Sequence, residues 1–77
     1  MINKNMPNKQ YNIIFVNGQA FNCLRYMSLK DLLTYMEFDL NLVIVEYNKK
    51  IVHCNNFNHI FFKSQDKIEV ITITGGG

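Results

Sequence analysis

The chain has 77 residues and a formal net charge of +2, with 48% hydrophobic, 13% aromatic and 18% charged residues. A chain of this length forms one domain with a small core, and a substrate pocket of about 300 Å³ or more would compete with that core for residues. The hydrophobic content excludes a disordered chain. The eight positive side chains are scattered along the sequence, which argues against nucleic acid as the main partner.

The composition also bears on where the protein works. The N-terminus has no apolar run that could serve as a signal peptide, and no stretch is long enough to span a membrane. With two cysteines and nothing else typical of secretion, an intracellular, reduced protein is expected. Asn, Ile, Lys, Phe and Tyr abound, whereas Ala and Arg occur once each. Codons of the abundant residues are A+T-rich, so the protein is expected in a bacterial cytoplasm or, if organelle-encoded, in a plastid stroma.

A β-hairpin opens the ordered part of the chain. Residues 1–10 are polar and aperiodic, and they are interpreted as a flexible extension. Tyr-Asn-Ile-Ile-Phe-Val at 11–16 is typical of a strand, and Asn17-Gly18 follows it with the residue types that a type I′ turn requires. A two-residue loop pairs Val16 with Gln19 and Ile14 with Phe21. The side chains expected on one face are Ile14, Val16, Phe21 and Cys23.

One helix follows the hairpin. Ser28 and Asp31 fit a capping box at its start, and the helix is expected to fade around 37–39. Its apolar positions recur at i, i+3, i+4 and i+7, which predicts a stripe that covers one face of a small sheet. These positions are Leu29, Leu32, Leu33 and Met36.

The second half predicts three further strands. Residues 43–47 and 51–53 form a short hairpin around Asn48-Lys49, and residues 67–74 form the clearest strand in the chain. Between them, residues 55–64 are expected to be irregular. The side chains that hold this segment to the body are Phe57, Ile60, Phe61 and Phe62.

The order of elements indicates an α+β fold of the β-grasp (ubiquitin-like) type. It predicts a mixed sheet of four to five strands, with the first and last strands central and parallel and one main helix packed on one face. The domain comprises residues 11–74, and Gly75, Gly76 and Gly77 form a flexible tail. Fold alone does not assign function, since β-grasp domains have many roles.

The residues with reactive side chains do not form a site of their own. His53 and His59 have no partner at metal-ligand spacing, so no metal is expected. Cys23 is interpreted as a core residue, and Cys54 beside His53 points to the opposite face of a strand. An RNA-binding alternative has Phe15, Tyr11 or Tyr47 stacking on bases. No cofactor and no catalytic residue is predicted.

The glycine end is the strongest functional feature. It follows a strand without a linker, and glycine can thread a narrow channel because it lacks Cβ. A terminal glycine also cannot epimerise when its carboxyl is activated. This pattern predicts a carrier whose Gly77 carboxyl reacts inside a partner enzyme.

From Ile14 to Gly77 the sequence resembles the ThiS family of thiamine-biosynthesis sulfur carriers. The matching segments are Val16–Gln19, Ser28–Leu33, Val43–Val52 and Asp66–Ile71, followed by the glycine end. The segment Val-Ile-Val-Glu-Tyr-Asn-Lys-Lys-Ile-Val and the glycine end are the most specific. Ser64-Gln65 departs from the Asp-Gly turn common in the family. Gly76 and Gly77 are the positions that the resemblance carries over, and Gly75 and Gly76 form the tail that enters the partner active sites.

The resemblance implies a division of labour. A ThiF-like, E1-like enzyme uses ATP to adenylate Gly77, and sulfur from a persulfide donor converts the adenylate to a thiocarboxylate. A ThiG-like thiazole synthase then takes the sulfur. The alternatives are carriers for molybdopterin synthesis or tRNA thiolation, a ubiquitin-like modifier, and a β-grasp interaction module or RNA-binding module.

The sheet face without a helix is the predicted docking surface. Glu69, Ile71 and Ile73 alternate onto one side of the last strand, and Phe15 is expected beside them on the first. An exposed apolar patch on so small a domain is typical of a partner-binding surface. The alternative is that another part of the chain covers this face.

Overall fold

The computed structural model describes residues 10–73, which form a five-stranded mixed sheet with one α-helix and one 3₁₀ helix. The elements are β1 (Tyr11–Val16), β2 (Gln19–Leu24), α1 (Leu29–Tyr35), β3 (Val43–Tyr47), β4 (Lys50–Val52), the 3₁₀ helix η2 (Cys54–His59) and β5 (Lys67–Thr72). The strand order is β2-β1-β5-β3-β4, and only β1 and β5 pair in parallel within the described region. The predicted β-grasp arrangement is confirmed.

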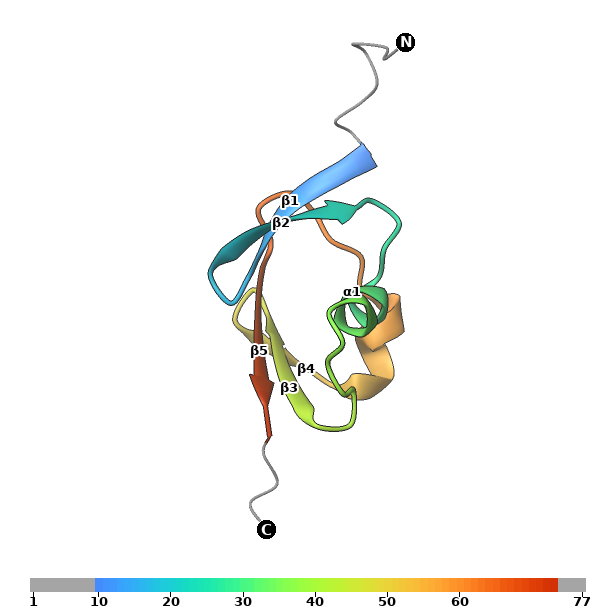
Figure 1. Ribbon diagram of the computed structural model, residues 1–77, viewed down its shortest axis with the longest axis vertical. Helices are drawn as coiled ribbons and strands as arrows, with labels where there is room; N and C mark the ends of the chain where they lie inside the picture. Colours follow the sequence, from blue (N-terminus) through green and yellow to red (C-terminus); the bar gives the residue numbers. More distant parts are fainter. Residues whose placement is uncertain (1–9, 74–77) are drawn as a thin grey trace.

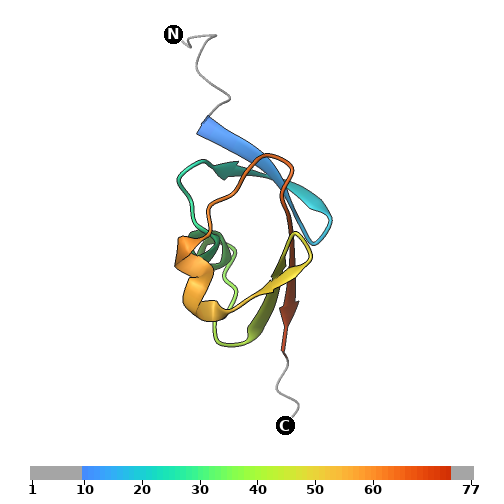
Figure 2. The ribbon, with the colours of Figure 1, turned by 180° about the vertical axis from the view of Figure 1, so that it is seen from behind.

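The two helices lie on the same side of the sheet, as Figures 1 and 2 show. The core fills the space between them and the sheet. Its buried side chains are Ile14, Val16, Cys23, Leu29, Leu32, Leu33, Val45, Phe57, Phe62, Ile68 and Val70. Burying apolar surface supplies most of the driving force for a domain of this size.

The β1–β2 hairpin has the register expected from its two-residue turn. Val16 pairs with Gln19 and Ile14 with Phe21, so the predicted inward face is confirmed. Asn17 and Gly18 have φ values of 50° and 84°, which a type I′ turn requires. The local sequence therefore determines which residues of both strands face the core.

Asn17 also joins the hairpin to β5. The backbone N–H of Asn17 donates to the Ile68 carbonyl at 2.8 Å. Its side-chain Oδ1 accepts from the Val70 N–H at 2.7 Å, and its Nδ2 donates to the Val70 carbonyl at 3.2 Å. The side-chain amide of Asn17 thus supplies the two hydrogen bonds that the backbone of a further β1 residue would make to Val70, because the β1 backbone has already turned away.

Helix α1 begins with the predicted capping box. The Ser28 N–H donates to Asp31 Oδ2 at 3.0 Å, and the Asp31 N–H donates to Ser28 Oγ at 3.1 Å. The hydrogen bond from the Ser28 backbone, followed by the interaction with the Ser28 hydroxyl, lowers the pKa of the Asp31 carboxyl. The helix ends at Tyr35, and Glu37 has a φ of 66° that a continuing helix cannot adopt.

The segment after β4 corrects the sequence interpretation. Residues 54–59 form η2 rather than an irregular loop, and Phe57 and Phe62 are buried as expected. Phe61 was expected to hold this segment to the body, but it is 51% exposed. Its backbone forms a bridge with Ser28, and residues adjacent to a buried position in extended chain point outward.

The strand limits differ by one or two residues from those predicted. The structure has β4 at Lys50–Val52 instead of 51–53, and β5 ends at Thr72 instead of residue 74. Gln10, expected in the N-terminal extension, accepts a hydrogen bond at its carbonyl from the Arg25 N–H at 2.8 Å. The remaining residues of the extension lie outside the described residues.

A buried carboxylate, Asp66, fixes the start of β5. It accepts from the Tyr47 hydroxyl, from Asn48 Nδ2 at 3.1 Å and from the Lys63 N–H at 2.7 Å. Asn48 Oδ1 in turn accepts from the Lys67 N–H at 2.8 Å. The β3–β4 turn and the first residue of β5 are therefore held by one network, in which burial and the bond to Asp66 raise the pKa of Tyr47 to about 12.

This network predicts a loss of stability at high pH. Because the folded state raises the Tyr47 pKa above its ordinary value of 10, its contribution is complete below pH 10 and is lost as the pH rises toward 12. Tyr47→Phe should cost about 1.5 kcal/mol at pH 8. The stability gap between wild type and variant, measured by urea unfolding, should narrow between pH 10 and pH 11.5. A gap that stays constant over this range would contradict the assignment.

The Asn17 amide predicts a second stability effect. Asn17→Gly keeps the positive φ without strain but removes both bonds to Val70, so the free energy of unfolding should fall by about 1–3 kcal/mol. Lys49→Gly is the matched control, because Lys49 has a φ of 74° in the other hairpin turn. That variant should unfold at the same or higher urea concentration than wild type. Equal midpoints for Asn17→Gly and wild type would refute a role for the amide.

Candidate functional site

The last strand carries the chain toward the predicted reacting end. Gly75, Gly76 and Gly77 lie outside the described residues, so their predicted role stays a prediction. The strand before them, β5, is central in the sheet and hydrogen-bonded to β3 along its length. The last bond on that side runs from the Ile73 N–H to the Leu42 carbonyl at 2.6 Å. The attachment point of the glycine end is therefore fixed to the sheet.

The predicted docking residues lie together on the side of the sheet opposite α1, here named the open face. Phe15 is in register with Lys67 on parallel β5, and Glu69, Ile71 and Ile73 follow on the same side by alternation. Ile71 is 53% exposed and Ile73 44% exposed, whereas Phe15 is half-buried. The structure thus places all four residues on one face.

Two further residues of the open face come from β3. Ile44 is the direct partner of Ile71, and Glu46 is the partner of Glu69. The patch therefore has an apolar pair next to an acidic pair. Sequence reasoning missed both β3 residues, although the alternation within 43–47 could have indicated them. Their pairing with Ile71 and Glu69 depends on the register between β3 and β5, which no local signal encodes.

A surface hollow connects two of the predicted docking residues. It has a volume of about 470 Å³ and is lined by Phe15, Gly18, Gln65, Lys67 and Glu69. The hollow lies at the junction of the hairpin turn with the start of β5. Its lining offers one aromatic ring and charges of both signs, which suits a mixed apolar and polar contact.

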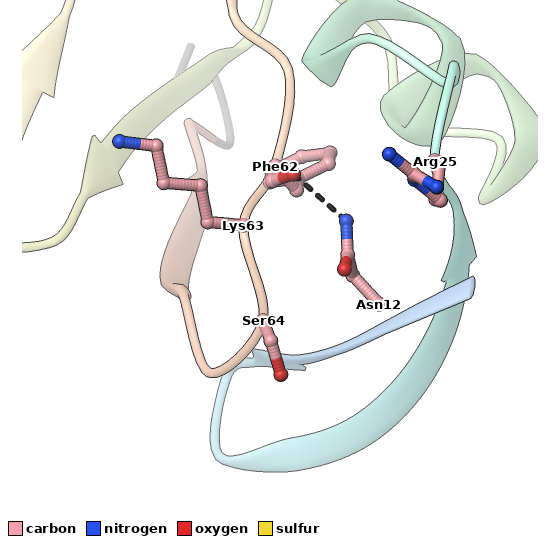
Figure 3. A pocket seen from close by; sticks show the side chains of 5 residues that line it. All are labelled: Asn12, Arg25, Phe62, Lys63 and Ser64. Carbon is pink, nitrogen blue, oxygen red and sulfur yellow. Dashed lines mark hydrogen bonds between the residues drawn. The ribbon is translucent and has the colours of Figure 1, made fainter. Parts of the chain in front are cut away.

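A second hollow, of about 520 Å³, lies near the N-terminal end of β1. It is lined by Asn12, Arg25, Phe62, Lys63 and Ser64, and none of these is a His, Cys, Asp or Glu that could act as a general base. Figure 3 shows the Lys63 side chain extending away from Arg25, and Asn12 Nδ2 donating to the Phe62 carbonyl at 2.9 Å. The two positive groups do not converge on one point.

The Cys23 thiol and the His53 imidazole have structural rather than catalytic roles. Cys23 is buried, and burial, followed by the charge of Asp31, raises the pKa of its thiol to about 11. It is therefore protonated at neutral pH and is a poor nucleophile. His53 Nδ1 accepts from the Asn55 N–H at 3.2 Å and caps η2. Between residues 10 and 73, no group of three or more His, Cys, Asp or Glu side chains could hold a metal ion.

The position of Tyr47 contradicts part of the RNA-binding alternative. The RNA-binding interpretation placed its ring on the open face with Phe15 and Tyr11. In the structure Tyr47 packs against the core side, 6.2 Å between ring centroids from Phe62, and its hydroxyl binds Asp66. Odd-numbered residues of β3 face the helices, so the proposed stacking set is divided between two faces.

Neither helix in the described part of the chain is long and apolar enough to cross a membrane.

The sequence matches a known family and curated proteins. The model of the ThiS family matches residues 14–77. A protein of Porphyra purpurea named "Uncharacterized protein ycf40" is 39% identical over the full length of both chains. Its namesake in Trieres chinensis is 41% identical over 82% of this chain and 86% of its own.

Solved structures agree on the fold. A thiamine biosynthesis protein (ThiS) from Geobacter metallireducens superposes with a TM-score of 0.72 at 24% identity, over 84% of this chain and 99% of its own. The UBL domain of yeast Ddi1 superposes with a TM-score of 0.61 at 16% identity, over 88% and 95% of the two chains. At these identities the likeness concerns the β-grasp fold. Because the family model covers most of the chain, including the specific 43–52 segment and the glycine end, this protein belongs to the ThiS family.

Proposed function

We propose that this protein is a sulfur carrier whose Gly77 carboxyl is converted to a thiocarboxylate for thiazole formation in thiamine biosynthesis. The observation that carries the proposal is the family match, which runs through Gly77. It is supported by the position of β5, which brings the chain out of the centre of the sheet toward the glycine end. Three glycines offer a reacting carboxyl on a segment without side chains.

The proposed chemistry needs activation of a stable carboxylate. The Gly77 carboxylate attacks the α-phosphorus of ATP in a ThiF-like enzyme, and pyrophosphate leaves. A persulfide sulfur then attacks the acyl-adenylate and AMP leaves, because AMP is a far better leaving group than an oxide ion. A second thiol attacks the donor's sulfur in the resulting acyl disulfide, forms a disulfide with it and releases the thiocarboxylate. A ThiG-like thiazole synthase is the proposed acceptor of this sulfur.

In this proposal the protein is a co-substrate and not an enzyme. ATP belongs to the partner, and the carrier binds no cofactor of its own. The hollow near the N-terminal end of β1 is lined by no His, Cys, Asp or Glu side chain that could act as a general base, which supports this assignment. The composition, rich in residues with A+T-rich codons, supports a plastid stroma or a bacterial cytoplasm as the location.

The open face is the proposed docking surface for these partners. Ile44, Ile71 and Ile73 are 40–53% exposed on the same face as Phe15, and apolar side chains exposed on one face favour binding of another protein. Glu46 and Glu69 add a second kind of contact, because directly opposed carboxylates favour a basic group between them.

Intact-mass spectrometry tests the carrier function. After incubation with ATP, a ThiF-like enzyme and a persulfide donor, the chain should show one exchange of oxygen for sulfur, which fragmentation should assign to Gly77. A chain with one alanine appended after Gly77 is the control and should stay unmodified, because the activated carboxyl would be displaced. An unchanged mass in wild type, with an enzyme active on its own carrier, would refute the proposal.

Charge substitution tests the docking surface. Ile71→Glu should lower the kcat/KM of carrier-dependent ATP–pyrophosphate exchange by about tenfold or more, since it removes apolar contact and adds a third carboxylate to the open face. Tyr26→Glu is the matched control, because Tyr26 is 73% exposed on the β2–α1 loop, away from this face. Circular dichroism should confirm that both variants fold. Equal kinetics for the two variants would exclude this face as the interface.

A further inference from the structure

The backbone of β5 alternates between two neighbours. The Asn48 N–H donates to the Lys67 carbonyl and the Ile73 N–H donates to the Leu42 carbonyl, so the odd-numbered residues face β3. The even-numbered residues face β1: the Asp66 and Ile68 carbonyls accept from β1 and from Asn17. Within a strand this alternation is fixed by the pleat. Thr72 must therefore direct its N–H and C=O toward the β1 side.

On the β1 side, the sheet ends before Thr72. The β1–β5 register stops at Val16–Ile68, and the Asn17 side chain covers Val70. The turn at Asn17-Gly18 then reverses the chain, so no residue of β1 or β2 lies beside Thr72. Figure 1 shows β5 continuing past the tip of the β1–β2 hairpin with β3 on its other side. Thr72 is exposed and forms an open sheet edge.

This open edge lies five residues before Gly77. An extended chain spans about 3.3–3.6 Å per residue, so the Gly77 carboxyl can lie about 16–18 Å beyond Thr72. A strand that pairs with Thr72 would keep the chain extended at its exit from the sheet. It would also reduce the conformational entropy that the following residues lose when they enter a narrow active site.

We propose that the β1-side edge of β5 at Thr72 pairs with an extended segment of the adenylating enzyme that acts on Gly77. This inference rests on the proposed function and adds a main-chain contact to the open-face contacts. A second copy of this chain is a weaker occupant, because one residue supplies only two hydrogen bonds to an edge-to-edge dimer. The enzyme is the better occupant, since it also binds the residues that follow Thr72. Strand addition at an exposed edge is a common mode of peptide recognition.

A proline substitution isolates this contact. Thr72→Pro removes the N–H that faces the β1 side and leaves the bonds of Ile71 and Ile73 to β3 in place. The kcat/KM of ATP–pyrophosphate exchange should fall by about tenfold. Thr72→Val is the control, because it keeps the N–H and nearly the same shape, and its kinetics should equal those of wild type. A Thr72→Pro variant within twofold of wild type would overturn the inference.

Amide hydrogen exchange gives a second measurement on the unmodified chain. The Thr72 amide should exchange rapidly in the isolated carrier and at least tenfold more slowly in complex with the enzyme and ATP. Unchanged exchange in the complex would refute the pairing, and protection in the isolated carrier that grows with concentration would assign the edge to a second copy. If wild type is adenylated while Thr72 stays unprotected, only this inference fails. If wild type is not adenylated, the proposed function itself fails.

Discussion

The parallel pairing of β1 with β5 is the constraint on which the rest of this structure depends. It joins the N-terminal hairpin to the three strands of the second half, yet its direct register covers only Phe15–Lys67 and Val16–Ile68. Hydrogen bonds to the Asp66 carbonyl at one end and to Asn17 at the other lengthen it. Parallel strands cannot be joined by a short turn, so this pairing closes the domain over more than 50 residues and shapes its small core.

Two asparagines secure β5 to its two neighbours in the same way. Asn17 and Asn48 each occupy the first position of a tight hairpin turn, with φ values of 50° and 49°. Each also binds the backbone of β5 through its side chain, Asn17 at Val70 and Asn48 at Lys67. Glycine would satisfy the backbone conformation but not the hydrogen bonds, which gives asparagine two roles at each turn. The specific 43–52 segment of the family therefore positions β5 as well as forming a hairpin.

The central place of β5 links the fold to its proposed use. One face of the strand packs Ile68 and Val70 into the core, and the other presents Glu69 and Ile71 beside residues of β1 and β3. Its end passes beyond the hairpin and leaves Thr72 at an open edge. A single strand thus contributes a surface, an edge and the exit of the chain. Because all three sit on one rigid element, a partner can bind them in a fixed geometry.

The sequence by itself determined the features that arise from neighbouring residues. The Asn17-Gly18 turn, the capping box of Ser28 and Asp31 and the inward face of β1 all follow from local backbone chemistry or side-chain period. Only the tertiary structure decided which residues from distant strands meet. It placed Ile44 opposite Ile71 and Glu46 opposite Glu69, turned Tyr47 toward Asp66, exposed Phe61 and aimed the Asn17 amide at Val70. These depend on registers between segments far apart in the chain, and such registers are set by packing of the whole core rather than by any local pattern.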